Sequence, residues 1–363
     1  MAEQVDLEVE SHDLGVFEKY LTVWVGVCIL LGILIGHFSP ETSSALSEFE
    51  VYHVSVPIAI CLFLMIYSIM VQIDFKKVTE AAKTPKPVII SSTINWLIKP
   101  VTKTLLAMLF FGVIFAPILP ADEASSYMAG LILLGIAPCT AMVLMWVHLA
   151  KGNQGLNLVM IAIDSLIMIA VYAPLASFLL GVADIIVPWG TIAFSIIIYI
   201  GVPLIIGYFS RTYLLKNKGA DWFKNTFMPI MSKLSKGALL ATLVILFILQ
   251  GGVIIENPLV ILLIAIPLTI QFVLIFFVGY GISRAAKLSY EDAVPVSLVG
   301  TSNHFEVAIA VAIMLSDIIG PGAALATVVG VLIEVPIMLW LVALMKKYKH
   351  KFPKYAEAET EAA

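Results

Sequence analysis

Two short stretches of the chain combine helix-breaking residues with side chains that can bind a small polar molecule. The first reads Gly135-Ile-Ala-Pro-Cys139, and the second reads Gly300-Thr-Ser-Asn303 with His304 and Glu306 directly after it. A thiol is a soft ligand, whereas hydroxyl, amide and carboxylate oxygens are hard ligands and hydrogen-bond partners. The residues that we expect to bind a ligand are Cys139, Thr140, Ser302, Asn303 and Glu306.

A second set of polar residues lies inside long apolar runs. Lys99, Lys103, Asp164 and Glu334 would each cost about 2.5–3.5 kcal/mol at the centre of a membrane helix, so each needs a partner or a role. For Asp164 and Glu334 we expect a structural hydrogen bond or ion pair. The candidates for a supporting or coupling role are Glu334, His304 and Asn95.

His304 remains open between a ligand, a proton carrier and a packing residue, since its charge switches near neutral pH. The other two cysteines, Cys28 and Cys61, lie in uninterrupted apolar runs and are expected to be small buried hydrophobic residues. Trp96 is expected to pack in the core, and His148 to lie at the membrane interface.

The composition places these residues in a membrane protein. Of 363 residues, 61% are hydrophobic and 13% are charged, whereas soluble domains average about 45–50% and about 25%. The mean hydropathy is +1.02. With 21 basic and 25 acidic residues and a net charge of −4, the chain is a poor candidate for nucleic-acid binding. Three cysteines are too few for a disulfide framework, and no cofactor is expected.

Apolar runs of about 20 residues, the length of a membrane-spanning helix, recur along the whole chain. The sequence therefore predicts an all-α polytopic membrane protein with ten transmembrane helices. The predicted spans are 17–37, 54–71, 88–116, 128–149, 156–179, 190–209, 237–255, 258–281, 293–315 and 322–345.

The distribution of lysine and arginine predicts that both termini are cytoplasmic. With that orientation, every basic residue except Lys99 and Lys103 falls in a cytoplasmic segment. The expected segments are a tail (1–16), the first five-helix repeat with the first helix of the second (17–209), a basic cytoplasmic loop (210–236), helices seven to ten (237–345) and a cytoplasmic tail (346–363).

Five spans per half imply that the two halves are inverted relative to each other, as in many secondary transporters. The fourth and ninth spans are then equivalent, and both contain one of the two breaks. Irregular backbone at membrane depth is tolerated where protein buries it or where it lines a cavity. We therefore expect the breaks to cross at a substrate site, with a simple packed kink at Pro138 as the alternative.

Three long stretches of the sequence resemble a known family. They are Gly135-Ile-Ala-Pro-Cys-Thr-Ala-Met-Val-Leu-Met-Trp146, Gly300-Thr-Ser-Asn-His-Phe-Glu-Val-Ala-Ile-Ala-Val-Ala-Ile313 and Ala324-Leu-Ala-Thr-Val-Val-Gly-Val-Leu-Ile-Glu-Val-Pro-Ile-Met338. They are similar to the arsenical-resistance-three family of arsenite efflux permeases, in the bile acid/arsenite/riboflavin transporter superfamily. The resemblance extends from about residue 17 to residue 348.

The resemblance implies ten helices in two inverted five-helix repeats, and export of trivalent arsenic across the cell membrane by proton antiport. The family's essential cysteine falls on Cys139, as an arsenic ligand, and its functional glutamate falls on Glu306. The partners implied are arsenite, protons and the lipid bilayer, with antimonite as a second candidate substrate. Two residues depart from the expected pattern: Val147 follows the motif's tryptophan, and His304 stands where an aromatic or apolar residue is usual. The oligomeric state stays open.

Two other functions compete with arsenite export. A sodium-coupled importer of an organic anion on the same fold would use the oxygen donors as cation ligands, although a hard sodium ion has no use for Cys139. An intramembrane cysteine-dependent enzyme would need a base beside Cys139, and the sequence has no histidine within a helical turn of it. The sequence therefore predicts a transporter and not an enzyme.

Overall fold

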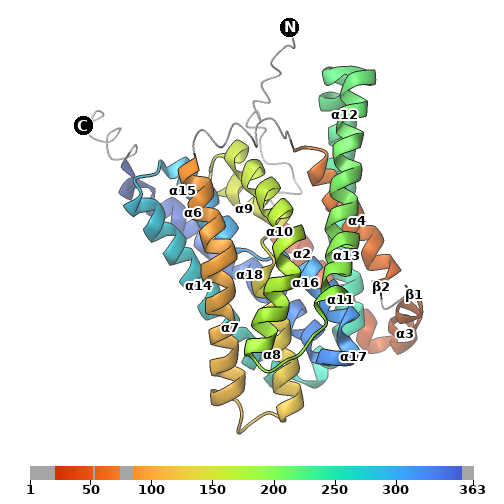
Figure 1. The fold of residues 1–363 in the computed structure, drawn as a ribbon. Helices are drawn as coiled ribbons and strands as arrows, with labels where there is room; N and C mark the ends of the chain where they lie inside the picture. Colours follow the sequence, from red (N-terminus) through yellow and green to blue (C-terminus); the bar gives the residue numbers. More distant parts are fainter. Residues whose placement is uncertain (1–20, 52–53, 74–84, 354–363) are drawn as a thin grey trace.

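The structure is a computed structural model that describes residues 21–51, 54–73 and 85–353, and these residues are almost entirely helical (Figure 1). The exception is an antiparallel pair of two-residue strands, β1 (Glu50–Val51) and β2 (Val54–Ser55). The expected N-terminal tail (1–16) and the end of the expected C-terminal tail lie outside the described residues.

The first part of the chain alternates long helices with short connections. Its α-helices are α2 (Leu21–Phe38), α3 (Pro40–Glu48), α4 (Val56–Met70), α6 (Pro85–Thr93), α7 (Lys99–Leu109), α8 (Ala121–Ile136), α9 (Met142–Leu149) and α10 (Gln154–Val182). Two π-helical turns, Ile94–Ile98 and Phe110–Ile114, continue α6 and α7 into one long helix.

The second part of the chain is helical as well. Its α-helices are α11 (Trp189–Ile196), α12 (Val202–Trp222), α13 (Met228–Glu256), α14 (Pro258–Ala285), α15 (Tyr290–Thr301), α16 (Phe305–Met314), α17 (Ser316–Ile319) and α18 (Gly322–Lys347). Two further π-helical turns, Ile197–Gly201 and Phe223–Phe227, flank α12, and a 3₁₀ turn, Lys349–Lys351, ends the described chain.

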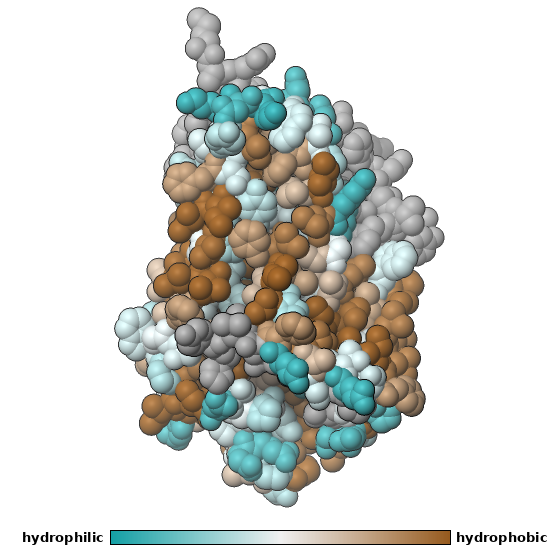
Figure 2. Space-filling model, turned by 90° about the vertical axis from the view of Figure 1, so that its right-hand side faces the viewer, coloured by the Kyte–Doolittle hydropathy of each residue, from teal (hydrophilic) through white to brown (hydrophobic). Residues whose placement is uncertain are grey.

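The helices are those of a polytopic membrane protein. Among the described residues, five helical segments are long and apolar enough to cross a membrane, and three shorter apolar helices accompany them. The described parts of the predicted ranges are mainly helical, except at Val54–Ser55, which form β2, at the end of 88–116, and at the two breaks inside 128–149 and 293–315. On the face in Figure 2, apolar side chains gather over the middle of the molecule and hydrophilic ones over its two ends, as expected for a protein surrounded by lipid.

Packing divides the helices into two groups. In the first, α13 packs along α2 and α4, and α12 packs on α4; we call these four helices the apolar group. In the second, α8 packs on α7, α16 and α18, while α14 packs on α15 and α18; we call helices α6–α10 and α14–α18 the crossing group. In Figure 1 the apolar group lies on the right and most of the crossing group on the left and centre.

Both predicted helix breaks are present, and local chemistry explains each. Between α8 and α9, Ala137 is extended (φ −86°, ψ 105°), because a proline disfavours the helical conformation of the residue before it and has no N–H to donate. Between α15 and α16, Ser302 is extended (φ −73°, ψ 153°). Serine and asparagine side chains compete for backbone hydrogen bonds, and this favours an interruption at Ser302 and Asn303.

The segment 210–236, expected as a basic loop, is helical instead. It comprises the end of α12, the turn Phe223–Phe227 and the start of α13, with a kink at Gly219 (φ 81°). Its lysines disfavour a place inside the bilayer but not the helical conformation, in which lysine is a good residue. In Figure 1 this end of α12 projects beyond the other helices.

Candidate functional site

The two breaks meet, as the sequence predicts. Pro138 and Asn303 form an isolated antiparallel bridge, and the backbone N–H of His304 donates to the carbonyl of Ala137 at 2.9 Å. Each break thereby satisfies part of the backbone that the other leaves without helical partners. The expected substrate-binding residues are consequently gathered at one point inside the crossing group.

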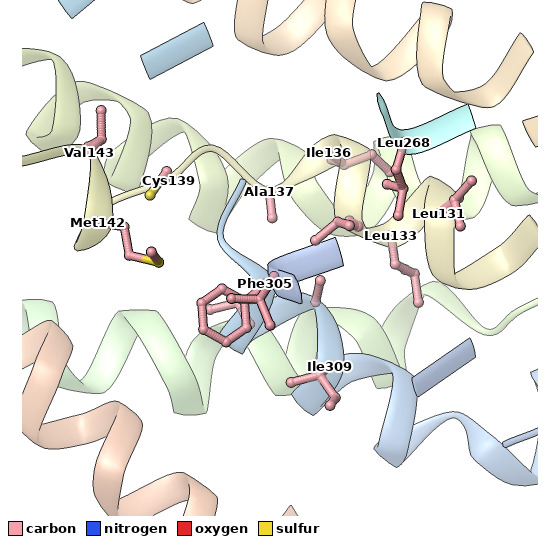
Figure 3. Close-up of a cluster of buried hydrophobic side chains, with 14 of the residues drawn as sticks. Leu131, Leu133, Ile136, Ala137, Cys139, Met142, Val143, Leu268, Phe305 and Ile309 are labelled. Atoms are coloured by element: carbon pink, nitrogen blue, oxygen red, sulfur yellow. The ribbon is translucent and has the colours of Figure 1, made fainter. Parts of the chain in front are cut away.

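Cys139 lies in the first break, between α8 and α9. Its side chain is 2% exposed, and it interacts with the side chain of Ser302 and the backbone of Val143. The thiol of the first break therefore lies beside the second break. Figure 3 shows Cys139 with Met142 and Phe305, which belong to the apolar cluster around the crossing.

The second break is held by Glu334 of α18. The Ser302 hydroxyl donates to Glu334 Oε1, and the backbone N–H of Asn303 donates to the same oxygen at 3.3 Å. Glu334 is fully buried. This carboxylate therefore makes the structural hydrogen bonds expected of it, and it makes them at the predicted site itself.

Glu306 and His304 form a buried pair at the start of α16. His304 Nδ1 lies 2.9 Å from Glu306 Oε2, and the two side chains are 1% and 3% exposed. Glu306 lies in the first helical turn, where the partial positive charge of a helix N-terminus favours a carboxylate. Glu306 Oε1 and His304 Nε2 have no hydrogen-bond partner among the described residues, so both atoms are free to meet a ligand.

Asn95 points to Asp164 instead of to the breaks. Its amide Nδ2 donates to Asp164 Oδ2 at 2.9 Å, and the indole N–H of Trp96 donates to Asp164 Oδ1 at 2.9 Å. Both donors lie in the π-helical turn Ile94–Ile98. Pro100 follows and cannot donate to the carbonyl of Trp96, which explains why the helix widens here. Asp164 therefore has the structural partners expected of it.

Two lysines of α7 belong to the site although sequence reasoning did not assign them to it. Lys99 and Lys103 are each 1% exposed. Lys99 Nζ donates to the backbone carbonyl of Ser302 at 3.2 Å. Their spacing of four residues puts both on one face of α7, and this is the signal in the sequence that points to a common environment.

Polar atoms without partners concentrate at the crossing. Buried polar groups are normally hydrogen-bonded, so such a concentration needs an explanation. In the part of the chain that the structure describes, the unpartnered atoms of the crossing are Thr140 Oγ1, Asn303 Oδ1 and Nδ2, His304 Nε2, Glu306 Oε1, Glu334 Oε2 and Lys103 Nζ. They are suited to a small ligand with several hydroxyl groups.

The thiol stands alone among these oxygen and nitrogen atoms. Within the described residues there is no group of three or more histidine, cysteine, aspartate or glutamate side chains that could hold a metal ion. Cys28 is buried on α2, and Cys61 is half-buried on α4. The site is therefore built for contact through one sulfur and several oxygens.

Comparisons with known proteins identify the family of the chain. The sequence model of the sodium bile acid symporter family matches residues 59–257. The chain is 52% identical over 356 residues to "Uncharacterized transporter slr0944" of Synechocystis, covering 96% of this chain and 93% of that protein. It is 46% identical over 347 residues to the arsenical-resistance protein Acr3 of Alkaliphilus metalliredigens, covering 96% of this chain and 97% of that one. It is 32% identical over 354 residues to Acr3 of Corynebacterium glutamicum, covering 95% and 93%.

Proposed function

Since the chain belongs to the sodium bile acid symporter family and, within it, to the Acr3 arsenical-resistance proteins, we propose that it exports arsenite across the cell membrane in exchange for protons. Its family and relatives are transporters, and the chain is a transporter and not an enzyme. The substrate is a small inorganic molecule, with antimonite as a second candidate.

The observation that carries this proposal is the single buried thiol at the crossing of the two breaks. Arsenite is a neutral trihydroxide near neutral pH, and its soft arsenic centre favours sulfur. Three thiolates would hold arsenic tightly, whereas a carrier must also release it. Cys139 with the oxygens of Thr140, Ser302 and Asn303 offers one strong contact and several weak ones.

Binding through Cys139 conserves atoms and charge. The As–S bond forms as one As–O bond breaks, and the thiol proton leaves with the released hydroxide as water. Release is the reverse reaction, in which water returns a hydroxide to arsenic and a proton to sulfur. The remaining arsenic hydroxyls donate to nearby oxygens, and the atoms that lack partners at the crossing include suitable acceptors.

Glu306 is our candidate for the coupling carboxylate. Asp164 interacts electrostatically with Lys99, and Glu334 with Lys103, whereas Glu306 pairs with His304. In its ionised form Glu306 accepts a hydrogen bond from an arsenic hydroxyl on the cytoplasmic side. Protonation from the outside weakens that bond and favours release, and His304 is placed to take part in the proton transfer.

We further propose ten spans in two inverted five-helix repeats with both termini in the cytoplasm. The matching order of helices and the two crossing breaks support the repeats, and the distribution of lysine and arginine supports the orientation. A single cysteine placed in the segment 210–236 of a cysteine-free variant is expected to react with a membrane-impermeant reagent only after the cells are opened. Labelling of intact cells would contradict this orientation.

Flux measurements test the function itself. Purified protein is placed in liposomes, and arsenite movement is followed by elemental analysis with and without a pH gradient and with sodium or choline as the main cation. We expect transport that the pH gradient accelerates and that sodium leaves unchanged. Transport of an organic anion that requires sodium, without arsenite movement, would favour the competing sodium-coupled function, for which the oxygen donors of the second break are the supporting observation.

A further inference from the structure

Each broken helix has a lysine of α7 at the end of its first half, Lys99 at the end of α15 and Lys103 near the end of α8. Lys99 Nζ donates to the carbonyl of Ser302 at 3.2 Å, and Ser302 is the C-cap of α15. The stem of Lys103 packs against Gly135 near the end of α8, where an added Cβ would lie 2.9 Å from Lys103 Cβ. The C-terminal end of a helix carries partial negative charge and favours a cation.

The end of α15 also offers the ligands of a hard cation. A bound alkali or alkaline-earth ion takes backbone carbonyls, hydroxyls and carboxylates. The carbonyl and hydroxyl of Ser302 and the carboxylate of Glu334 meet there. In secondary transporters, unwound carbonyls and the C-terminal ends of half-helices coordinate the coupling cation.

In this chain the side-chain nitrogen of Lys99 occupies the position at the end of α15 that a bound cation would take. Lys99 is 1% exposed, and the carboxylates that interact with it electrostatically are those of Asp164 and Glu334. A second ammonium is close by, because Lys103 interacts electrostatically with Lys99 and Glu334. Lys103 Nζ lies 5.4 Å from the ring centroid of Phe272, a distance at which a cation is attracted by an aromatic face.

We propose that Lys99 is a tethered cation that takes the place of a bound metal ion at the end of α15 and thereby makes transport independent of sodium. The covalently attached ammonium offsets the partial negative charge of the Ser302 carbonyl and the charge of the Glu334 carboxylate, and unlike a metal ion it does not dissociate. It therefore stabilises the crossing at every step of the transport cycle, but it cannot couple transport to a sodium gradient. This inference deepens the proposed function, on which it rests, because it explains why protons and not sodium ions are exchanged.

The test measures thermal unfolding of the purified full-length protein in sodium chloride and in choline chloride at equal ionic strength. The wild type is expected to melt at the same temperature in both salts. Lys99→Ala removes the ammonium group and leaves its position at the end of α15 open, so this variant is expected to melt at a lower temperature than the wild type in choline chloride. When sodium or lithium replaces choline, the melting temperature of the variant is expected to rise by roughly 2–4 °C, since an ion that binds only the folded state stabilises the folded state. Lys99→Arg keeps the charge and is expected to stay independent of sodium.

Lys86 provides a matched control. It is an exposed lysine that donates to the carbonyl of Ala286, the C-cap of α14. Lys86→Ala removes the same kind of contact at the surface and is expected to show no dependence on sodium. Lys99→Asn, which leaves a smaller space and adds an amide oxygen, replaces the alanine variant if that variant does not fold.

Two results would overturn the proposal. One is a wild type that is stabilised, or whose arsenite flux is accelerated, by sodium. The other is a set of Lys99 variants that lose the same stability in sodium and in choline, as a purely structural ion pair would predict. Because unfolding is measured without arsenite, a failure of arsenite transport in liposomes would count against the proposed function and leave the result on Lys99 intact.

Discussion

The apolar group and the crossing group pack in the same membrane protein by opposite means. In the apolar group, α2 and α13 approach each other through glycine: a Cβ on Gly32 would lie 2.8 Å from the carbonyl oxygen of Val244, and one on Gly251 would lie 2.8 Å from that of Ile33. The hydroxyl of Thr242, buried between the helices, donates to the carbonyl of Ala238 in its own helix and lies 3.9 Å from Met65 Sδ of α4. Among the described residues, no buried charged side chain lies between these helices, and their packing depends mainly on shape.

In the crossing group, buried polar and charged side chains of one helix form hydrogen bonds with another helix. Every buried lysine, histidine, aspartate and glutamate of the described chain belongs to it, namely Lys99, Lys103, Asp164, His304, Glu306 and Glu334. Several of their atoms have no partner, which is costly in a medium of low dielectric constant. Such a cost is expected where side chains serve a ligand, so the difference predicts that one group supports the fold and that the other binds and moves the substrate.

The largest expected effect separates cysteines of the two groups. Cys139→Ser removes the sulfur that we propose as the arsenic ligand while nearly keeping the size of the side chain, and arsenite resistance of cells is expected to fall to that of cells without the protein. Cys28→Ser and Cys61→Ser, both in the apolar group, are expected to keep most of it. Growth in arsenite, with the amount of membrane protein measured in parallel, decides between them. Full resistance of Cys139→Ser would remove the thiol from the mechanism.

The next effect concerns coupling within the crossing group. Glu306→Gln mimics the protonated side chain permanently, so arsenite flux in liposomes is expected to lose its response to a pH gradient. Glu306→Asp keeps a carboxylate with a reach shorter by one methylene, and a partial response is expected. If Glu306→Gln responds to the gradient as the wild type does, another group carries the proton, and His304 and Glu334 are the next to be replaced.

A smaller effect is expected at Asp164, where the polar contacts are complete. Asp164→Asn removes the charge beside Lys99 and weakens two hydrogen bonds, from Asn95 and Trp96. Hydrogen bonds to charged groups contribute about 1.5–3 kcal/mol each, so the melting temperature and the amount of folded protein are expected to fall. The ratio of flux with and without a pH gradient is expected to stay near that of the wild type in the protein that folds. A lost ratio at normal stability would make Asp164 part of the coupling.

The sequence predicted the helices and the breaks because their signals are local. Apolar length predicted the helical segments, Pro138 and the Ser302–Asn303 stretch predicted the interruptions, and their equivalent positions indicated that the breaks meet. The number of spans stays a prediction. The segment 210–236 was predicted less well, because positive charge keeps a segment out of the bilayer without deciding whether it is helical. Its place in the cytoplasm stays a prediction.

The contacts between distant helices could not be predicted in the same way. Lys99 and Ser302 are separated by 203 positions in the chain, and their contact depends on how α7 is rotated about its axis against α15. Similarly, Glu334 reaches Ser302 only because α18 turns that face towards the second break. Periodicity does not fix such a rotation when a helix is apolar on all sides, as α18 is, and an amphipathic pattern such as that of α7 does not say which distant helix its polar face meets.

The smallest expected effect returns to the apolar group and tests whether it acts through shape alone. An added Cβ at Gly32 would lie 2.5 Å from Phe247 Cβ and 2.8 Å from the Val244 carbonyl oxygen. Gly32→Ala must therefore move α2 and α13 apart, and overpacking of this kind typically costs about 1–3 kcal/mol. The melting temperature is expected to fall, while the response of arsenite flux to a pH gradient stays that of the wild type, because no polar contact of the crossing is altered.

Gly26 on the same helix is the matched control, since a Cβ there would have no atom within 4 Å. Alanine is a better helix residue than glycine, so Gly26→Ala is expected to leave the melting temperature unchanged or slightly raised. A Gly32→Ala protein that melts normally but no longer responds to the gradient would show that the spacing of α2 and α13 takes part in transport. The division into a supporting group and a transporting group would then be wrong, because a change of shape in the apolar group would have reached the coupling carboxylate.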